Sequence, residues 1–376
     1  MRRALIGAIC LVLAACGGGA VASPSGLASG QVPARPSPSE AAASATPTAS
    51  IDLISDLDAL VAGFQGFQGS ALVALGDKIL LSKGYGMADA AKGIRNAPET
   101  RFRLASLTKQ FTAVAILILE SQGKLDVKDA ACTYLQDCPP AWRAITIHQL
   151  LSHTSGLHDF TELPDFESIK NQPSTAAQTL ARIKGLPLDF APGQGFHYNN
   201  SGYAALGSIV ERVSGMAYEA FLRQEIFGPL GMLDTGYDTG AGRLATGYKN
   251  ATTVADPTNA SVYLAAGGLY STVLDMHRWD QALYTDRLMP KDLLATMFQP
   301  MTAIPDVPNL RYGYGVYVGT MADRPFVGHD GAVEGSRTYY GRHPDDRLSV
   351  ILLSNVESEV AYEELDRSIT QLVLDR

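Results

Sequence analysis

The sequence predicts an α+β protein in which an antiparallel sheet is flanked by N- and C-terminal helices and joined to a mostly helical lobe. Two observations predict it. Strand-like hairpins occur near both ends of residues 51–376, and the stretch between them is long, helical and rich in loops. Antiparallel hairpins from the two ends can join one sheet, with the terminal helices against a face. The crevice between the sheet and the helical lobe is a natural place for a binding site.

The composition of the whole chain excludes several classes of protein. Of the 376 residues, 46% are hydrophobic and 18% are charged, which is close to the globular average and excludes wholesale disorder, a collagen-like chain and a polytopic membrane protein. The formal net charge is −8 and no basic run stands out, so nucleic acid is not expected as a partner. The 4 cysteines are too few for a disulfide scaffold.

Residues 1–15 are predicted to be a signal peptide. Arg2 and Arg3 precede an uncharged, mostly apolar stretch from Ala4 to Ala15, which is too short to cross a bilayer about 30 Å thick. The stretch ends in Leu-Ala-Ala-Cys16, which resembles the lipobox of bacterial lipoproteins. That resemblance implies cleavage before Cys16, acylation of Cys16 and a membrane-anchored protein of the bacterial cell envelope. The alternative is a plain secretory signal with an incidental cysteine.

Residues 16–50 are predicted to be a lipid-anchored, disordered linker. From Gly17 to Ser50, 26 of the 34 residues are Ala, Ser, Gly or Pro, so this stretch has nothing to pack. Two more cysteines, Cys132 and Cys138, lie close together in an expected loop. In an oxidising compartment they either pair as a local disulfide or remain free thiols.

Hydrophobic periodicity places the elements of residues 51–376 in order. The first helix has apolar residues at three- and four-residue steps from Leu53 to Phe64. A hairpin follows, with strands over Ser70–Leu75 and Ile79–Tyr85 around Gly76-Asp77. Leu107–Glu120 is apolar on every side, which is typical of a helix in the middle of a core.

The second half of the domain is predicted in the same way. Two helices are expected in the lobe, and a hairpin and a closing helix follow near the C-terminus. Their ranges are Ala204–Val213, Tyr218–Phe227, Arg337–Arg342 with Leu348–Leu353, and 359–374. The turn of the last hairpin contains Asp345-Asp346, and both tryptophans, Trp142 and Trp279, are expected to be packing residues.

The first candidate catalytic motif is Ser106-Leu-Thr-Lys109 at the start of the apolar helix. A serine and a lysine three apart share one helix face, and a desolvated lysine can be neutral and accept the serine proton. The helix N-terminus also favours developing negative charge. Ser121 and Lys124 repeat the spacing, but they lie at the helix C-terminus, where the dipole disfavours an anion. We therefore prefer Ser106.

Two further motifs accompany the first. Tyr198-Asn-Asn200 offers a phenol that can relay a proton and an amide that can orient its neighbours, and Tyr248-Lys-Asn250 repeats that spacing. His329-Asp-Gly331 comes shortly before the C-terminal hairpin. A strand edge there can offer a backbone N–H to an oxyanion.

These motifs, in this order, resemble the serine β-lactamase and penicillin-binding-protein superfamily, in its class C-like branch with D-alanyl-D-alanine carboxypeptidases and esterases. The flanks are similar too, and Tyr198-Asn-Asn-Ser-Gly-Tyr203 matches the branch better than Tyr248 does. Further familial stretches are Phe102–Phe111, Ile145–Leu157, Tyr218–Met232 and Gly267–Thr272. The resemblance spans about residues 51–376 and implies a β-lactamase/transpeptidase-like serine hydrolase domain of two lobes.

The resemblance assigns a role to each motif residue. Ser106 would be the acylated nucleophile and Lys109 its activating partner. Tyr198 would pass the proton to the leaving group and help to activate the deacylating water, while Asn200 positions the substrate. The backbone N–H groups of Ser106 and Ala332 would form the oxyanion hole beside Gly331.

The third motif departs from authentic class C β-lactamases. They have lysine where this chain has His329, and histidine there resembles the peptidase and esterase members. Such an exchange weakens a fixed positive charge near a substrate carboxylate. Asp330 stands where the family usually has Thr, Ser or Gly, and its carboxylate would pair with His329 or repel an anionic substrate. Arg337 and Arg342 are expected to be solvated rather than to restore the charge.

The sequence thus predicts a membrane-anchored serine hydrolase that works without a cofactor through a Ser106 acyl-enzyme. An ester or D-Ala-type amide, small or derived from peptidoglycan, is the expected substrate. The alternatives are a class C-like β-lactamase and a non-catalytic penicillin- or peptidoglycan-binding lipoprotein. No metal is expected. His148, His153 and His158 lack the carboxylate partners of metal ligands, and His153 is expected to brace a loop by hydrogen bonding. Substrate specificity is expected to depend on the loops between residues 156 and 200 and around 300–330.

Overall fold

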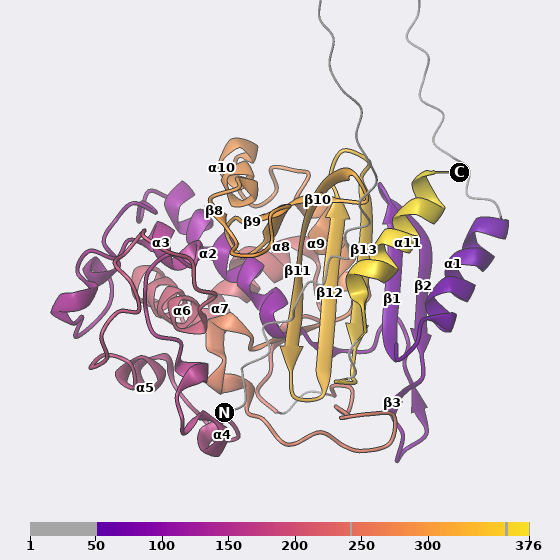
Figure 1. Ribbon diagram of the computed structural model, residues 1–376, viewed down its shortest axis with the longest axis horizontal. Helices are drawn as coiled ribbons and strands as arrows, with labels where there is room; N and C mark the ends of the chain where they lie inside the picture. The colour runs from indigo at the N-terminus through magenta and orange to yellow at the C-terminus, as the bar shows by residue number, and fades with distance from the viewer. Residues whose placement is uncertain (1–50, 241–242, 358–359, 376) are drawn as a thin grey trace, which may run out of the picture. The chain divides into compact units, whose positions relative to one another are not determined.

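The computed structural model describes residues 51–240, 243–357 and 360–375. The predicted signal peptide, Cys16 and the linker lie outside the described residues. No helix within those three ranges is long and apolar enough to span a membrane. The predicted α+β class is confirmed, with an antiparallel sheet, terminal helices and a helical lobe (Figure 1).

An eight-stranded antiparallel sheet unites the two ends of the domain. The N-terminal hairpin pairs through β1 with the C-terminal strand β13, with Gly69 opposite Ser354 and Leu75 opposite Leu348. The predicted hairpins are therefore confirmed as parts of one sheet. In spatial order the strands are β2 (Lys78–Tyr85), β1 (Gly69–Leu75), β13 (Leu348–Ser354), β12 (Ser336–His343), β11 (Arg324–Val333), β10 (Tyr317–Met321), β9 (Leu310–Tyr312) and β8 (Thr302–Ala303).

Helices cover both faces of this sheet. On one face, α11 (Tyr362–Leu374) packs beside α1 (Ile51–Gly63), and Asp366 of α11 accepts a hydrogen bond from Tyr339 of β12. On the other face, Asp280 of α9 (Val273–Ala282) accepts one from Tyr340, the next residue of β12. Successive strand residues point to opposite faces, so α11 and α9 lie on opposite sides of the sheet.

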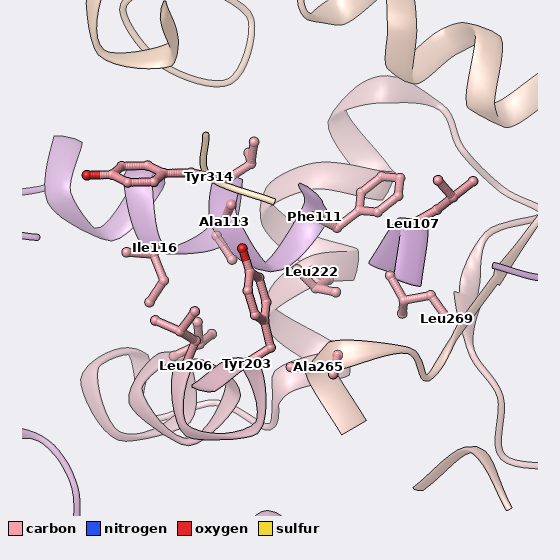
Figure 2. Close-up of a cluster of buried hydrophobic side chains, with 14 of the residues drawn as sticks. Leu107, Phe111, Ala113, Ile116, Tyr203, Leu206, Leu222, Ala265, Leu269 and Tyr314 are labelled. Carbon is pink, nitrogen blue, oxygen red and sulfur yellow. The ribbon is translucent and has the colours of Figure 1, made fainter. Parts of the chain in front are cut away.

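The helical lobe is built around α2 (Thr108–Ser121), in which every residue from Thr108 to Leu119 is buried. Figure 2 shows Phe111, Ala113 and Ile116 of α2 among side chains of α6 (Asn200–Ser214) and α7 (Tyr218–Leu222). The remaining helices are α3 (Ile147–Leu151), α4 (Phe166–Ile169), α5 (Ala176–Ala181), α8 (Gly228–Leu230) and α10 (Lys291–Ala295). Small sheets pair β3 (Met87–Asp89) with β4 (Ile94–Arg95), and β5 (Phe102–Arg103) with β7 (Leu269–Ser271) and β6 (Gly236–Tyr237).

Helix α6 begins earlier than its hydrophobic pattern predicts. It starts at Asn200, because the Asn199 side chain accepts a hydrogen bond from the Gly202 N–H at 2.8 Å and caps the helix. The motif Tyr198-Asn-Asn200 thus lies at a helix N-terminus. The helix predicted over Tyr218–Phe227 is also modified, because it continues from Arg223 as a π-helical turn.

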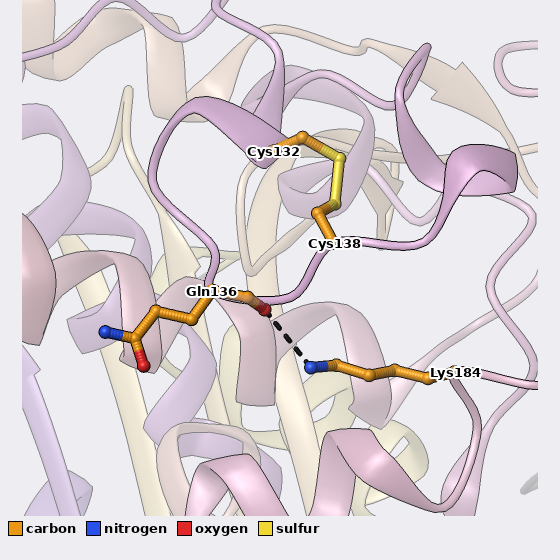
Figure 3. The surroundings of a disulfide bond; sticks show 4 residues. All are labelled: Cys132, Gln136, Cys138 and Lys184. Carbon is orange, nitrogen blue, oxygen red and sulfur yellow. Dashed lines mark hydrogen bonds between the residues drawn. A yellow bond between two sulfur atoms is a disulfide. The ribbon is translucent and has the colours of Figure 1, made fainter.

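Cys132 and Cys138 form a disulfide (Figure 3). Within the loop that it closes, the Gln136 carbonyl accepts a hydrogen bond from Lys184 Nζ at 3.1 Å. Both tryptophans pack in the core as expected: Trp142 is 2% exposed and Trp279 is 0% exposed. The Trp279 indole N–H donates to the Gln110 side chain.

Candidate active site

Ser106 lies in a short 3₁₀ turn, Ala105–Leu107, that leads directly into α2. The preceding residue, Ala105, has a φ of +48°, a left-handed conformation that costs an alanine free energy and is common at functional turns. The Leu104 N–H donates to the Leu269 carbonyl at 2.8 Å and anchors the turn to the small sheet. The serine hydroxyl is thereby held at the N-terminus of the most buried helix in the lobe.

Lys109 is fully buried, one helical turn after the serine. Its Nζ donates to Ser106 Oγ at 3.1 Å, to Asn200 Oδ1 at 2.9 Å and to the Ala266 carbonyl at 2.9 Å. Burial lowers the pKa of Lys109 to about 7, although the carboxylates of Asp159 and Asp330 oppose that shift. A neutral amine is thus abundant at neutral pH beside the serine hydroxyl, which is what a general base requires.

Tyr198 stands on the other side of the lysine. Lys109 Nζ lies 4.7 Å from the centroid of the Tyr198 ring. Burial raises the pKa of Tyr198 well above its usual value of 10, and hydrogen bonding to Ser106 opposes that shift. The phenol therefore stays protonated at neutral pH, and the two groups are separated in role: Lys109 can accept a proton and Tyr198 can donate one.

Asn200 is oriented by Asp159, which the sequence analysis did not select. The buried Asp159 carboxylate accepts hydrogen bonds from the Asn200 backbone N–H at 2.8 Å and from its side-chain amide at 3.0 Å. The Asp159 side chain also accepts from Thr161 N–H at 2.8 Å. The sequence contains one weak signal for Asp159, since it follows the familial Ile145–Leu157 stretch by two residues.

His329 lies in β11 and reaches the same site. Its ring is 5.9 Å from that of Tyr198, is 4.7 Å from Tyr317 in a stacked arrangement, and hydrogen-bonds through Nε2 to Tyr312 Oη at 3.0 Å. Burial and the nearby Lys109 lower the pKa of His329 to about 3. The imidazole is therefore neutral at physiological pH, so the exchange from lysine removes the positive charge rather than weakening it. No motif in the sequence pointed to Tyr312 or Tyr317.

Gly331 explains why β11 can approach the nucleophile so closely. A Cβ on Gly331 would lie 3.0 Å from Ser106 N, 2.6 Å from the Leu104 carbonyl and 2.4 Å from Thr338 Oγ1. Pairing between β10 and β11 ends at Gly328, so the following residues of β11 form an open edge beside the serine. Ala332 follows on this edge and is exposed, as an oxyanion donor must be to meet a substrate.

The charged side chains near the third motif differ from expectation in one case. Arg342 was expected to be solvated, and this is wrong: it is 2% exposed, and its Nε lies 3.2 Å from Oδ1 of the buried Asp280. Residue 342 of β12 is on the covered face of the sheet, where α9 supplies the counter-charge. Arg337 is partly buried and donates to the carbonyls of Val333 and Ser336 at 3.1 and 3.0 Å.

The rival motifs lie elsewhere and have structural roles. Ser121 Oγ donates to the Ile118 carbonyl at 2.7 Å at the end of α2. Tyr248 is buried and its hydroxyl accepts from the Ala90 N–H at 2.8 Å. The structure therefore brings together Ser106 with Lys109, Tyr198, Asn200, His329 and Gly331, and not the alternatives.

The three evenly spaced histidines have separate partners. His153 Nδ1 accepts from the Asn199 N–H at 3.0 Å and so braces the loop before α6, as expected. His148 Nδ1 lies 2.7 Å from Tyr314 Oη, and His158 Nδ1 lies 3.0 Å from Asp189 Oδ1. Among the residues with described positions, no group of three or more His, Cys, Asp or Glu side chains is arranged to hold a metal ion.

Comparisons with known proteins point to one family. The family described as Beta-lactamase matches residues 57–374. A penicillin-binding protein of Bacillus subtilis (strain 168) is 32% identical over 79% of this chain and 70% of its own length. The octameric penicillin-binding protein homologue from Pyrococcus abyssi has 26% identity and a TM-score of 0.76 over 86% of this chain and 77% of that chain. The D-amino acid amidase from Ochrobactrum anthropi SV3 has 25% identity and a TM-score of 0.75 over 86% and 99%.

Proposed function

This chain belongs to the Beta-lactamase family, and within it we propose a serine hydrolase that cleaves an ester or an amide through an acyl-enzyme on Ser106. The observation that carries the proposal is the contact between Lys109 Nζ and Ser106 Oγ at 3.1 Å, with the lysine pKa lowered to about 7. Burying an ionisable amine costs stability that an ordinary core residue would not cost, and a strongly shifted pKa of this kind is typical of functional sites.

The chemistry follows from the positions of the side chains. Lys109 accepts the proton of Ser106 as Oγ bonds to the substrate carbonyl carbon, and the charge that develops on the carbonyl oxygen lies towards Ser106 N–H and Ala332 N–H. When the bond to the leaving group breaks, Tyr198 supplies its proton and is reprotonated from Lys109. Water then attacks the acyl-enzyme, transfers its proton through the same groups and restores Ser106.

Asn200 acts in this scheme through Lys109. Its Oδ1 accepts from Lys109 Nζ at 2.9 Å, while its amide is held by Asp159. When the amine is neutral, its two N–H groups can be donated to Asn200 and to the Ala266 carbonyl, which leaves the nitrogen lone pair for Ser106 Oγ. We therefore regard Asn200 as a residue that positions the base, in addition to the substrate contact that the family resemblance implies.

Covalent labelling followed by turnover tests the proposal. A fluorophosphonate probe should label wild type and not Ser106→Ala, and wild type should then turn over nitrophenyl esters or a D-Ala-D-Ala peptide. Lys109→Ala and Tyr198→Phe should each slow acylation by about 100-fold or more. Ser121→Ala is the matched control, because it carries the rival motif, and it should be labelled at the wild-type rate.

The outcomes separate the alternatives. If wild type is not labelled, the enzyme proposal fails. Labelling by penicillin without turnover of any substrate would favour a binding protein, and rapid turnover of a cephalosporin would favour a β-lactamase. We place an ester or D-amino-acid amide first because the site lacks the fixed positive charge at position 329, where the imidazole is neutral.

We also propose that Cys16 anchors this enzyme to the envelope membrane. The support is the Leu-Ala-Ala-Cys16 sequence behind an apolar segment, and the disulfide between Cys132 and Cys138 suits an oxidising compartment. Cells fed a labelled fatty acid should incorporate it into wild type, and Cys16→Ala should lose both the label and membrane association. Cys10→Ala is the control and should keep both; a soluble, unlabelled wild type would contradict the anchor.

A further inference from the structure

The basic side chains discussed above near the third motif are each neutral or engaged by other groups of the protein. His329 is neutral, and Arg342 is buried against Asp280. Lys109 has a pKa of about 7 and is needed as a base in its neutral form. Arg337 is a further basic side chain near the third motif, and its guanidinium donates to the carbonyls of Val333 and Ser336.

The carboxylate of Asp330 places a negative charge at the third motif. The Asp330 side chain is 49% exposed, and its Oδ1 lies 3.8 Å from His329 Nδ1. Because His329 is neutral, this contact is not an ion pair, and the imidazole bonds instead to the backbone carbonyl of Asp330. Burial raises the pKa of Asp330, which Lys109 and Arg337 oppose, but half of the side chain meets water, which solvates the charge at neutral pH.

Asp330 is also close to the reacting groups. It immediately precedes Gly331, whose Cβ would lie 3.0 Å from Ser106 N. Burial lowers the pKa of Lys109 and raises that of Tyr198, and the Asp330 carboxylate is near enough to oppose the first shift and to add to the second. In the proposed reaction Tyr198 gives a proton to the leaving group, and its ring lies 5.9 Å from that of His329, the direct neighbour of Asp330. We therefore expect the leaving group to lie near Asp330.

The aromatic ring of Tyr317 lies beside these groups. Tyr317 is partly exposed and stacks on His329 with centroids 4.7 Å apart. Burial raises the pKa of Tyr317, and the carboxylates of Asp330 and Glu363 add to that shift. A carboxylate next to an aromatic face is a favourable environment for an organic cation, through charge attraction and cation–π contact. The same combination disfavours a carboxylate.

We propose that Asp330 is a specificity-determining residue that selects substrates whose leaving group carries a positive charge, such as an ammonium, and disfavours substrates with a carboxylate there. The proposal rests on the serine hydrolase function proposed above and names the charge of its substrate. It predicts weak reaction both with β-lactams and with a D-Ala-D-Ala peptide, because each carries a carboxylate next to the bond that is broken, so nitrophenyl esters are the better probe of the proposed function.

Three matched thioesters test the proposal. They share a butyryl group and differ in the thiol released: thiocholine is a cation, its tert-butyl isostere is neutral, and mercaptopropionate is an anion. For each, kcat/KM is measured from thiol release by wild type, Asp330→Asn and Asp77→Asn. Asp77 is exposed in the β1–β2 turn beside the turn that joins β12 to β13, so its substitution makes the same change in net charge away from the site.

Ratios between substrates isolate the effect of charge. Loss of Asp330 also lowers the pKa of Lys109, but that change affects all three thioesters equally. In wild type, kcat/KM for the cationic thioester should exceed kcat/KM for the neutral one by about fivefold. This is the effect of one charge at about 4 Å in water-like surroundings. Asp330→Asn should bring this cation-to-neutral ratio to about one and should raise the ratio of kcat/KM for the anionic thioester to that for the neutral one. Asp77→Asn should leave both ratios unchanged.

Other results would overturn the inference. If the cation-to-neutral ratio of kcat/KM is near one in wild type, or if Asp330→Asn leaves it unchanged, Asp330 does not determine specificity. The proposed hydrolase function would still stand. If Asp330→Asn lowers kcat/KM for all three thioesters and leaves their ratios unchanged, Asp330 has a structural role only. If no ester is cleaved and Ser106 is not labelled, the proposed function itself fails, and the inference fails with it.

Discussion

The carboxylate of Asp159 accepts two hydrogen bonds from Asn200, one from its backbone N–H at 2.8 Å and one from its side-chain amide at 3.0 Å. This relationship determines how the Asn200 amide faces, because Nδ2 must point to Asp159 and Oδ1 is left for Lys109 Nζ at 2.9 Å. Asp159 therefore acts on the base twice, through Asn200 and through its charge, which favours protonated Lys109.

The pH dependence of acylation should depend on Asp159. Neutral Lys109 is the active form, so kcat/KM of wild type should rise with pH through the lysine pKa of about 7 and level off above it. Asp159→Asn removes a charge that raises this pKa, so the rise should move to lower pH. The plateau should fall by about tenfold, because the new side-chain NH2 must face either the two Asn200 donors or the Thr161 N–H.

Asp165→Asn is the matched control for that experiment. Asp165 is in the same loop region but its carboxylate pairs with Arg182 at the surface, so the profile should keep the wild-type midpoint. A midpoint that Asp159→Asn leaves in place would remove Asp159 from the control of the lysine.

Lys109 should cost the folded protein stability. The folded state lowers its pKa from 10.5 to about 7, so the unfolded chain binds more protons between these values and stability rises with pH across that interval. The penalty is thus largest at pH 7 and below. We expect Lys109→Met to raise the free energy of unfolding by about 2 kcal/mol at pH 7, after the lost hydrogen bonds are subtracted, and by less at pH 9.5.

Urea unfolding at both pH values measures this difference. Lys124→Met is the control, since Lys124 follows the C-terminus of α2 and is exposed; its substitution should change stability little at either pH. The lowered pKa of Lys109 would be contradicted if Lys109→Met were less stable than wild type. It would also be contradicted if the substitution changed the free energy of unfolding by the same amount at both pH values.

Gly331→Ala should abolish acylation more than it harms folding. Its new Cβ would press on Ser106 N and the Leu104 carbonyl, which displaces the oxyanion donor and should lower the labelling rate by about 100-fold. Gly185→Ala is the control, because no atom lies within 4 Å of its added Cβ. Wild-type labelling of Gly331→Ala would show that β11 does not need to approach the serine so closely.

The buried ion pair between Asp280 and Arg342 should be important for stability. Both side chains are at most 2% exposed, and Tyr340 Oη donates to Asp280 Oδ1 at 2.6 Å. Asp280→Asn should lower the free energy of unfolding by about 3–5 kcal/mol, since it leaves a buried guanidinium without its counter-charge. Adding Arg342→Met should cost less than the sum of the single changes; strict additivity would mean that the pair is not coupled.

Local sequence patterns predicted most of the elements. The hairpin over Ser70–Tyr85 has two strand-like apolar runs around the turn-forming Gly76-Asp77, and α2 is recognisable because residues such as Val114 and Ile116 leave no polar face. Errors occurred where a side chain overrode periodicity. Helix α6 starts earlier than predicted because Asn199 caps it. Arg342 was expected at the surface, but it is buried in an ion pair with Asp280 of α9.

By itself, the sequence determined which residues are chemically suited to catalysis, because Ser106 with Lys109, Tyr198 with Asn200, and His329 with Gly331 are short-range patterns. Only the tertiary structure decided their electrostatics. The lysine pKa near 7, the neutral imidazole of His329 and the role of Asp159 all arise from burial and from partners far away in the chain. Desolvation and Coulomb interaction depend on distance in space, which a pattern of neighbours along the chain does not contain.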